Sequence, residues 1–331
     1  MKAPHFWSGH LDPQSREAAP LTRALLTPLA GIYAGITARR IRTASPTLLN
    51  IPVICIGNLT AGGSGKTPIA AAIRTRLSMS GLRTATLSRG YGGRLSGPLR
   101  VDPSKHTSQE VGDEPLMLAL LGEAWIAHDR ADGGEAMEAD GVDVIVMDDG
   151  FQNSSLGKDL SLLVIDTDDP VGNGYVIPKG PLREPVSAGL ARAHGIVLTG
   201  DGACPAWLEN APIPILRSRL IRSTEIPSGA LIAFAGLASP NKFFDALARD
   251  GANLADTVAF PDHHPYSDKD MALLRKLAAD HDAGLVTTEK DIVRLTRADQ
   301  AGIDVIRVTA SFDDEAALDE LLDPLANKAL A

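Results

Sequence analysis

Short runs of apolar residues alternate with segments of helical spacing along the first two thirds of the chain. Runs at 51–56, 84–88, 124–127, 142–147, 160–166 and 195–199 are aliphatic and largely continuous, as is typical of strands buried on both faces. After the first run, residues 68–80 place Ile69, Ala72, Ile73 and Leu77 at helical spacing and stop at Gly81. The alternation predicts an α/β fold with a mostly parallel sheet flanked by helices.

The same pattern restarts near residue 225. A strand is predicted over 230–237, a helix over 240–251, and further strands over 284–291 and 304–310. We therefore expect an N-terminal segment at 1–45, a larger α/β domain at 46–225, and a smaller α/β domain at 226–331 that closes over the active site. The Gly- and Pro-rich stretch 172–185 predicts an irregular loop long enough to be functional.

An uncharged, mostly apolar stretch over 24–38 precedes Arg39, Arg40 and Arg42. It is shorter than the roughly 20 residues of a bilayer-spanning helix, and a secretory signal would place its charges first. The pattern favours a helix lying in a membrane interface, with the arginines on anionic headgroups. The side chains expected to enter lipid are Leu25, Leu26, Leu29, Ile32 and Ile36. The alternative is a core helix packed on the domain.

The overall charge and cysteine content exclude some classes of protein. A formal net charge of −9 over 331 residues argues against a general nucleic-acid binder, which needs a basic surface. Two cysteines, Cys55 and Cys204, are too few for a disulfide framework, and Cys55 lies in a predicted buried strand. We expect two buried thiols and a reducing compartment.

The segment GNLTAGGSGKTP, residues 57–68, lies between the first predicted strand and the first predicted helix. Its glycines would let backbone N–H groups converge on a phosphate, Lys66 would reach the β and γ oxygens, and Thr67 could ligate Mg²⁺. Thr60 replaces the first glycine of the usual phosphate-loop pattern, at a position that turns the chain. The predicted nucleotide-binding residues are Thr60, Ala61, Gly62, Gly63, Ser64, Gly65, Lys66 and Thr67.

Several other polar residues are candidates for the site. Asp148 and Asp149 end a predicted strand at the sheet edge that carries the phosphate loop, where Mg²⁺ needs carboxylates, although acidic pairs also cap helices. Asp113 precedes an apolar helix and could equally be its N-cap, with Glu114 in the first turn. The remaining candidates are Tyr91 between glycines, Arg183 beside Glu184, and the loop histidines His263 and His264.

The motifs GNLTAGGSGKTP, LSRGYGG, VGDEP, VMDDGFQ, GPLREP, AFAGL, FPDHH and LVTTEKD occur in this order between about residues 24 and 290. Together they resemble the tetraacyldisaccharide 4'-kinases, the lipid A kinases of Gram-negative bacteria. That family has threonine at the first position of the loop, which accounts for Thr60. The combination of the loop with SRGYGG and DDGFQ is more specific than any one motif.

The resemblance implies a reaction and a set of roles. ATP would phosphorylate the 4'-hydroxyl of a tetraacylated glucosamine disaccharide 1-phosphate at the cytoplasmic face of the inner membrane, without an obligate protein partner. Asp113 would be the general base and His263 its partner, with His264 left unassigned. The implied Mg²⁺ ligands are Thr67, Asp148, Asp149 and Glu184, and the implied substrate- or phosphate-binding residues are Tyr91, Arg130, Gln152 and Arg183.

Two other functions are compatible with a phosphate loop. A P-loop GTPase acting as a switch or metallochaperone needs a guanine-reading Asn-Lys-x-Asp, but residues 241–244 read NKFF, and TEKD has the wrong register. A soluble ligase of cofactor biosynthesis has no use for an apolar segment followed by arginines. Comparing ATP and GTP turnover with a lipid disaccharide acceptor would separate the three functions.

Overall fold

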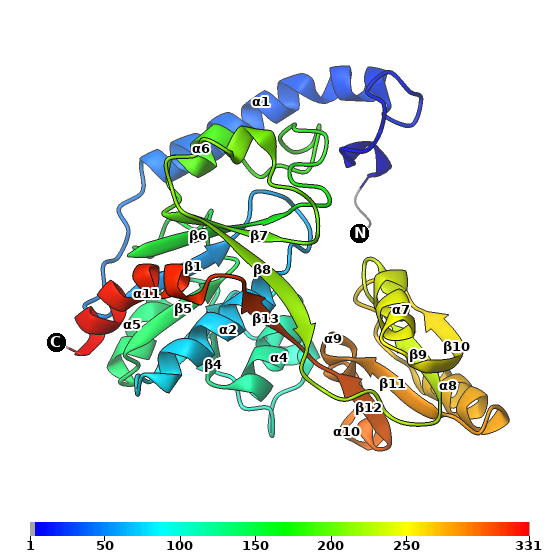
Figure 1. The fold of residues 1–331 in the computed structure, drawn as a ribbon. Coiled ribbons are helices and arrows are strands. Elements are labelled where there is room, and N and C mark those ends of the chain that lie inside the picture. The colour runs from blue at the N-terminus through cyan, green and yellow to red at the C-terminus, as the bar shows by residue number, and fades with distance from the viewer. Residues whose placement is uncertain (1–3, 331) are drawn as a thin grey trace.

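The computed structural model describes residues 4–330. Within them the strands form a nine-stranded and a four-stranded sheet (Figure 1). All neighbours in the large sheet are parallel except the two edge pairs, β13 with β8 and β3 with β4. Its strands, in spatial order, are β13 (Val308–Phe312), β8 (Ile215–Arg222), β7 (Gly195–Thr199), β6 (Leu160–Asp166), β1 (Val53–Gly57), β5 (Val144–Asp148), β2 (Thr84–Ser88), β4 (Ala124–Ile126) and β3 (Leu99–Arg100).

Helices cover both faces of the large sheet, which is why its central strands are apolar on both sides. Ile69 and Ile73 of α2 and Leu318 and Leu322 of α11 form one core with one face, while Met137 of α5 lies in the core on the other. The predicted mostly parallel, helix-flanked α/β fold is confirmed. The helical segments of this part are η1 (His5–Trp7), α1 (Pro20–Arg42), α2 (Lys66–Met79), α3 (Ser108–Val111), α4 (Asp113–Leu121), α5 (Arg130–Ala139), α6 (Val186–Leu190), η2 (Ala206–Leu208) and α11 (Glu315–Leu330).

The small sheet is entirely parallel, in the order β10 (Asn253–Ala259), β9 (Ala230–Ala235), β11 (Gly284–Thr288) and β12 (Ile303–Ile306). Phe244 and Leu247 of α7 (Pro240–Arg249) pack in one core with it, and Met271 and Leu274 of α8 (Asp268–Asp280) pack in another. The short helices α9 (Glu289–Ile292) and α10 (Arg297–Gln300) follow β11. We call residues 230–306 the small unit and the remainder, built on the large sheet, the large unit.

The end of the chain corrects the expected division at 226–331. β13 pairs antiparallel with β8 in the large sheet, and Leu318, Leu322 and Leu325 of α11 are buried in the core shared with α2. The apolar face of α11 packs against this core. The chain therefore leaves the large unit after β8 and returns to it at β13. The two units also share an apolar core, in which Leu116 and Ile126 of the large unit pack with Phe234 and Met271 of the small unit.

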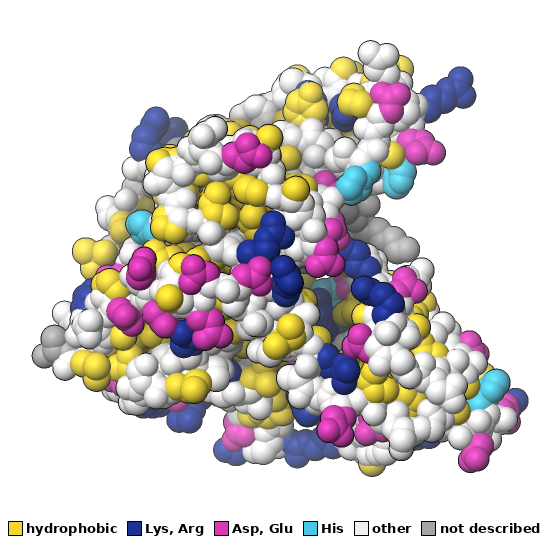
Figure 2. Space-filling view, in the orientation of Figure 1, with side chains coloured by type: hydrophobic (Ala, Val, Ile, Leu, Met, Phe, Trp, Pro, Cys, Tyr) yellow, Lys and Arg dark blue, Asp and Glu magenta, His cyan; other side chains and the backbone are white. Residues whose placement is uncertain are grey.

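Helix α1 lies along the surface of the large unit, above α6 in Figure 1. Ala30 is its only buried residue, so the alternative of a core helix is not what the structure has. Leu25, Leu29 and Ile36 are 79%, 53% and 64% exposed, and Figure 2 shows hydrophobic side chains along this upper ridge. Among the described residues, none of the helices has both the length and the apolar character that crossing a membrane requires.

Candidate active site

The loop between β1 and α2 has the geometry of an anion cradle. Gly62 and Gly65 have φ of 152° and 75°, which favour glycine, and a Cβ added at Gly62 or Gly63 would meet no atom within 4 Å. Helix α2 begins at Lys66 and points its free N–H groups at this space. Thr60 accepts a hydrogen bond from Asn58 Nδ2 at 3.2 Å and therefore secures the entrance of the loop.

Lys66 and Arg183 converge on Asp149, the second residue of the acidic pair. Lys66 Nζ lies 3.7 Å from Asp149 Oδ1, and Arg183 makes a two-pronged contact with both carboxylate oxygens at 2.9 and 3.1 Å. Burial favours the neutral carboxyl, but Lys66 and Arg183 outweigh it and hold the pKa of Asp149 below its ordinary value. Asp149 thus keeps both cations beside the loop, where a bound phosphate could compete for them.

Asp148 lies deeper and has a different environment. Its Oδ2 accepts a hydrogen bond from Thr67 Oγ1 at 3.0 Å, whereas Oδ1 is buried and has no partner among the described residues. Burial and the nearby charge of Glu114 raise the pKa of Asp148, against the opposing charge of Lys66. A buried, unpartnered carboxylate oxygen beside a threonine hydroxyl is a donor set that suits a hard divalent cation such as Mg²⁺.

The structure does not gather all four expected metal ligands. Glu184 is 2% exposed and pairs with Arg192 at 2.5 Å, while Gln152 donates to its other oxygen at 3.1 Å. Asp149 forms ion pairs with Lys66 and Arg183. Nowhere in residues 4–330 do three acidic, histidine or cysteine side chains converge as a metal site. Thr67 and Asp148 are in contact, whereas Asp149 and Glu184 are paired with Arg183 and Arg192, and the expected set of four ligands stays a prediction.

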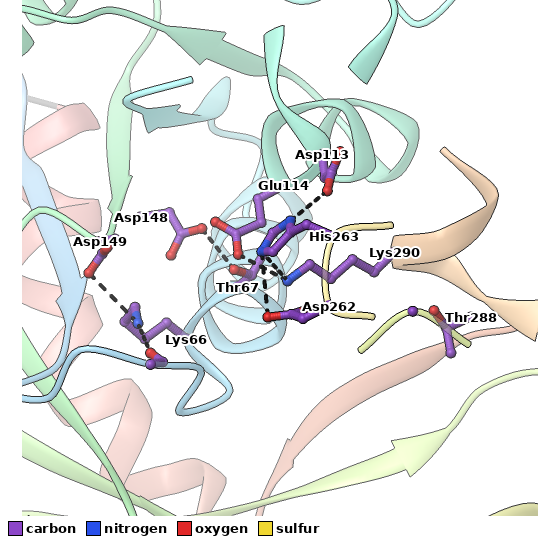
Figure 3. A network of polar contacts seen from close by, with 12 residues as sticks. Lys66, Thr67, Asp113, Glu114, Asp148, Asp149, Asp262, His263, Thr288 and Lys290 are labelled. Atoms are coloured by element: carbon purple, nitrogen blue, oxygen red, sulfur yellow. Dashed lines mark hydrogen bonds and ion pairs between the residues drawn. The ribbon is translucent and has the colours of Figure 1, made fainter. Parts of the chain in front are cut away.

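Asp113 and His263 meet across the two units, as Figure 3 shows. His263 Nδ1 lies 2.9 Å from Asp113 Oδ2, and Lys290 Nζ lies 3.4 Å from His263 Nε2. Asp113 is the first residue of α4 and Gly112 is the N-cap, so the alternative of an N-cap role for Asp113 is wrong. His263 has a φ of 57°, a strained value for a residue other than glycine and one often found at functional sites.

The neighbouring histidine, His264, is partly exposed and contacts other side chains of the small unit. Its Nε2 lies 3.1 Å from Asp270 Oδ2, and its ring stacks on Phe260 with the centroids 4.8 Å apart. It also meets Tyr266 edge to face. The two adjacent histidines therefore have different surroundings, and the structure brings His263 to Asp113.

Two of the expected substrate-binding residues, Tyr91 and Arg130, make no hydrogen bond with Asp113, His263, Lys66 or Asp149 among the described residues. Tyr91, on the loop after β2, is 79% exposed. Arg130 is buried at the start of α5, where it donates to the carbonyl oxygens of Ala127 and His128, and its Nε has no partner within the described chain. Burial and the like charge of Arg89 lower the pKa of Arg130 to about 10. Gln152 links Asn58, Glu184 and Arg183.

The sequence did not single out Lys290 or Arg294. Both follow β11, and Arg294 Nε donates to Asp113 Oδ2 at 2.7 Å. The motif LVTTEKD contains Lys290, but the motif by itself gives no role to any single residue. The parallel order of β9 and β11 was the available signal, because it brings the segments after both strands to one edge.

Two cavities adjoin the site. One, of about 340 Å³, lies between η1 and the outer side of the phosphate loop, with Trp7, Thr60, Ser64 and Asp166 in its wall. Figure 2 shows a recess between the N-terminal segment and the small unit. The other cavity, of about 280 Å³, lies between α1 and the network of Arg183 and Gln152, with Tyr33 and Arg40 on the helix side.

Comparison with known proteins agrees with the motifs. Residues 22–327 match the family described as "Tetraacyldisaccharide-1-P 4'-kinase". The chain is 55% identical over 329 residues to a tetraacyldisaccharide 4'-kinase of Hyphomonas neptunium, covering 99% of both chains. It is 48% identical to that of Maricaulis maris, covering 97% and 96%. It is also similar to a solved structure of LpxK from Aquifex aeolicus, an "apo" form in complex with ATP, with a TM-score of 0.74, 28% identity, and 92% and 99% covered.

Proposed function

The chain belongs to the tetraacyldisaccharide 4'-kinase family, and we propose from its site how it moves the γ-phosphoryl group of ATP to a lipid disaccharide. The acceptor is the 4'-hydroxyl of a tetraacylated glucosamine disaccharide 1-phosphate. The observation that supports this proposal is the contact of Asp113 in the large unit with His263 of the small unit, in the same region as Thr67 and Asp148 (Figure 3).

The loop residues and Lys66 bind and polarise the phosphates of ATP. Backbone N–H groups of 62–67 surround the β-phosphate, and Lys66 leaves Asp149 to contact the β and γ oxygens. Thr67 and Asp148 would hold Mg²⁺, whose contribution when bound is to neutralise charge on the phosphate oxygens. Arg183, released in part from Asp149, is placed to do the same for the transferred group.

Asp113 accepts the proton of the 4'-hydroxyl as its oxygen attacks the γ-phosphorus. The new P–O bond forms while the bond to the β-phosphate oxygen breaks, and ADP leaves with that electron pair. A carboxylate is a weak base, so the contribution of Asp113 depends on its position more than on its basicity. His263 holds Asp113 from the other unit at 2.9 Å.

The acceptor approaches from the side of α1. The exposed leucines and isoleucines of α1 enter the lipid interface, and the arginines of its last turn meet anionic headgroups at the cytoplasmic face of the inner membrane. The cavity between α1 and Arg183 leads from this surface to the phosphate-binding network. Tyr33 and Arg40 give it the polar lining that a sugar phosphate requires.

The family match decides against the GTPase and ligase alternatives. The structure supplies a physical reason for rejecting the first of them. Phe244, where a guanine-reading motif has its aspartate, is 7% exposed and packs in the core beneath α7. This segment is part of the framework of the small unit.

The test is transfer of labelled γ-phosphate to a purified tetraacyldisaccharide 1-phosphate in detergent. We expect product with ATP, little with GTP, and a kcat at least about 100-fold lower in Lys66→Ala with the fold retained, because transition-state charge is no longer neutralised. Lys276→Ala, at an exposed position on α8, is the matched control and should keep wild-type turnover. Near wild-type transfer by a folded Lys66→Ala protein would contradict the proposal.

A further inference from the structure

Arg294 joins the small unit to Asp113 through a buried guanidinium group. Its side chain is only 4% exposed. Nη1 donates to Gly236 O at 2.8 Å and to Asp291 Oδ1 at 2.9 Å, and Nε donates to Asp113 Oδ2 at 2.7 Å. Because the guanidinium is planar, two bonds within the small unit fix the direction of the third.

The anchor of Arg294 is itself fixed. Asp291 is 0% exposed and accepts hydrogen bonds from Gly236 N at 2.9 Å, Tyr266 Oη at 2.8 Å and Thr288 Oγ1 at 2.6 Å. Gly236 O also accepts from the backbone N–H of His263 at 3.2 Å. One carbonyl group therefore sets the positions of both residues that contact Asp113.

Arg294 and His263 bind the same oxygen of Asp113. Both contacts are to Oδ2, and within residues 4–330 Oδ1 accepts no hydrogen bond. Two donors on one oxygen restrict rotation of the carboxylate and leave the other oxygen for a substrate proton. A single donor would leave the carboxylate freer to turn.

We propose that Arg294 is a positioning residue that locks the carboxylate of Asp113, so that Oδ1 is the atom that takes the proton of the acceptor hydroxyl. The inference rests on the proposed function and adds a residue to it. Arg294 acts through Asp113 and does not itself contact the reacting atoms.

The charges around Asp113 determine how removal of Arg294 would change the pH dependence of kcat. The facing groups are Arg294, His263, Lys290, Glu114, Asp262 and Asp291. Burial acts to raise the pKa of Asp113, but His263 and Arg294 outweigh burial and keep the pKa below its ordinary value. Removing the Arg294 charge should therefore raise this pKa and shift the acid limb of kcat to higher pH.

Three variants test the proposal by steady-state transfer to the lipid acceptor across a range of pH. Arg294→Gln should lower kcat by about 10- to 100-fold with little change in KM for ATP, and its acid limb should move to higher pH. Arg294→Lys should have a higher kcat than Arg294→Gln and an acid limb close to that of the wild type. Lysine restores the positive charge but lacks the planar set of donors of the guanidinium group. Arg275→Gln, which removes an exposed pair with Asp299 on the same unit, is the control and should match wild type.

A folded Arg294→Gln protein with wild-type kcat and acid limb would overturn the proposal. So would a loss confined to KM with the pH profile unchanged, which would indicate a structural role only. If Arg294→Gln fails to fold, Arg294→Lys is combined with Asp113→Asn. The reduction in kcat caused by Arg294→Lys should then disappear in the Asp113→Asn background. A full additional reduction there would overturn the inference. Failure of the proposed function would instead appear as an absence of transfer by the wild-type protein.

Discussion

Asp148 keeps a carboxylate beside the phosphate loop, and one of its buried oxygens has no hydrogen-bond partner within residues 4–330. Burial raises its pKa from 3.8 to about 7. Between these values the folded state binds more protons than the unfolded state, so this group lowers the free energy of unfolding as pH rises through the window. The same unpartnered oxygen is what makes the residue suitable as a cation ligand.

Asp148→Asn should accordingly raise the melting temperature of the ligand-free protein, and by more at pH 8 than at pH 5. It should also weaken the stabilisation that Mg²⁺ with ADP gives to the wild type, and reduce kcat severely. Thermal unfolding at the two pH values measures this, with Asp132→Asn, an exposed carboxylate on α5, as the control. A lower melting temperature at pH 8 would show that the buried charge is already compensated.

The sequence predicted the positions of residues that lie at the ends of strands. It did not predict which side chains would form ion pairs with them. Strand ends predicted that Asp148 and Asp149 lie beside the loop, because carboxyl ends of parallel strands share an edge. Nothing in the sequence said that arginines would neutralise Asp149 and Glu184. Arg294 was missed for the same reason: its contact with Asp113 spans 181 positions and depends on how the units meet.

Among the elements, helix α1 differs in that most of its large hydrophobic side chains are exposed. A narrow inner face that includes Ala30 contacts the body, while Leu25, Leu29, Ile32 and Ile36 form an exposed stripe that precedes three arginines. The apolar pattern predicted a helix of about fifteen residues, but the helix runs for 23, from Pro20 to Arg42. Pro20 at the first position and arginines in the last turn both suit a helix, whereas Pro28 lies in its interior, where proline is disfavoured.

The triple variant Leu25→Ser, Leu29→Ser, Ile32→Ser should bind vesicles far more weakly while keeping kcat toward an acceptor presented in detergent, since it removes only the surface that enters lipid. Co-flotation with neutral and anionic vesicles measures it, and the preference for anionic vesicles should persist through the arginines. Met79→Ser removes a methionine 84% exposed on α2 and should float as wild type does. Equal flotation of all three proteins would place the membrane contact elsewhere.

Strand prediction was best where both faces of a strand are buried. The runs at 84–88, 160–166 and 195–199 coincide with β2, β6 and β7 because all their residues except Asp166 are buried. β8 and β10 were missed because most of their residues are exposed, so no apolar run marks them. The edge strand β3 has two residues and gives no pattern.

In the whole molecule, the site is completed only where the two units meet. The phosphate loop, Asp148 and Asp113 belong to the large unit, and His263, Lys290 and Arg294 belong to the small unit. An apolar core shared by the units and the paired strands β8 and β13 hold this arrangement. The sequence predicted a second α/β unit but not the return of β13 and α11, because strand order in a sheet is set by packing among distant segments.

We propose that Asp113 and His263 act as one unit across this boundary. The most direct test is a double-mutant cycle on kcat, with Asp113→Ala, His263→Ala, the double variant and His264→Ala as the neighbouring control, each checked for fold by thermal unfolding. Each single variant should lose about 100-fold or more, the double variant should lose clearly less than the product of the two, and His264→Ala should keep most of its turnover. Fully multiplicative losses, or an active His263→Ala protein beside a crippled His264→Ala protein, would contradict the account.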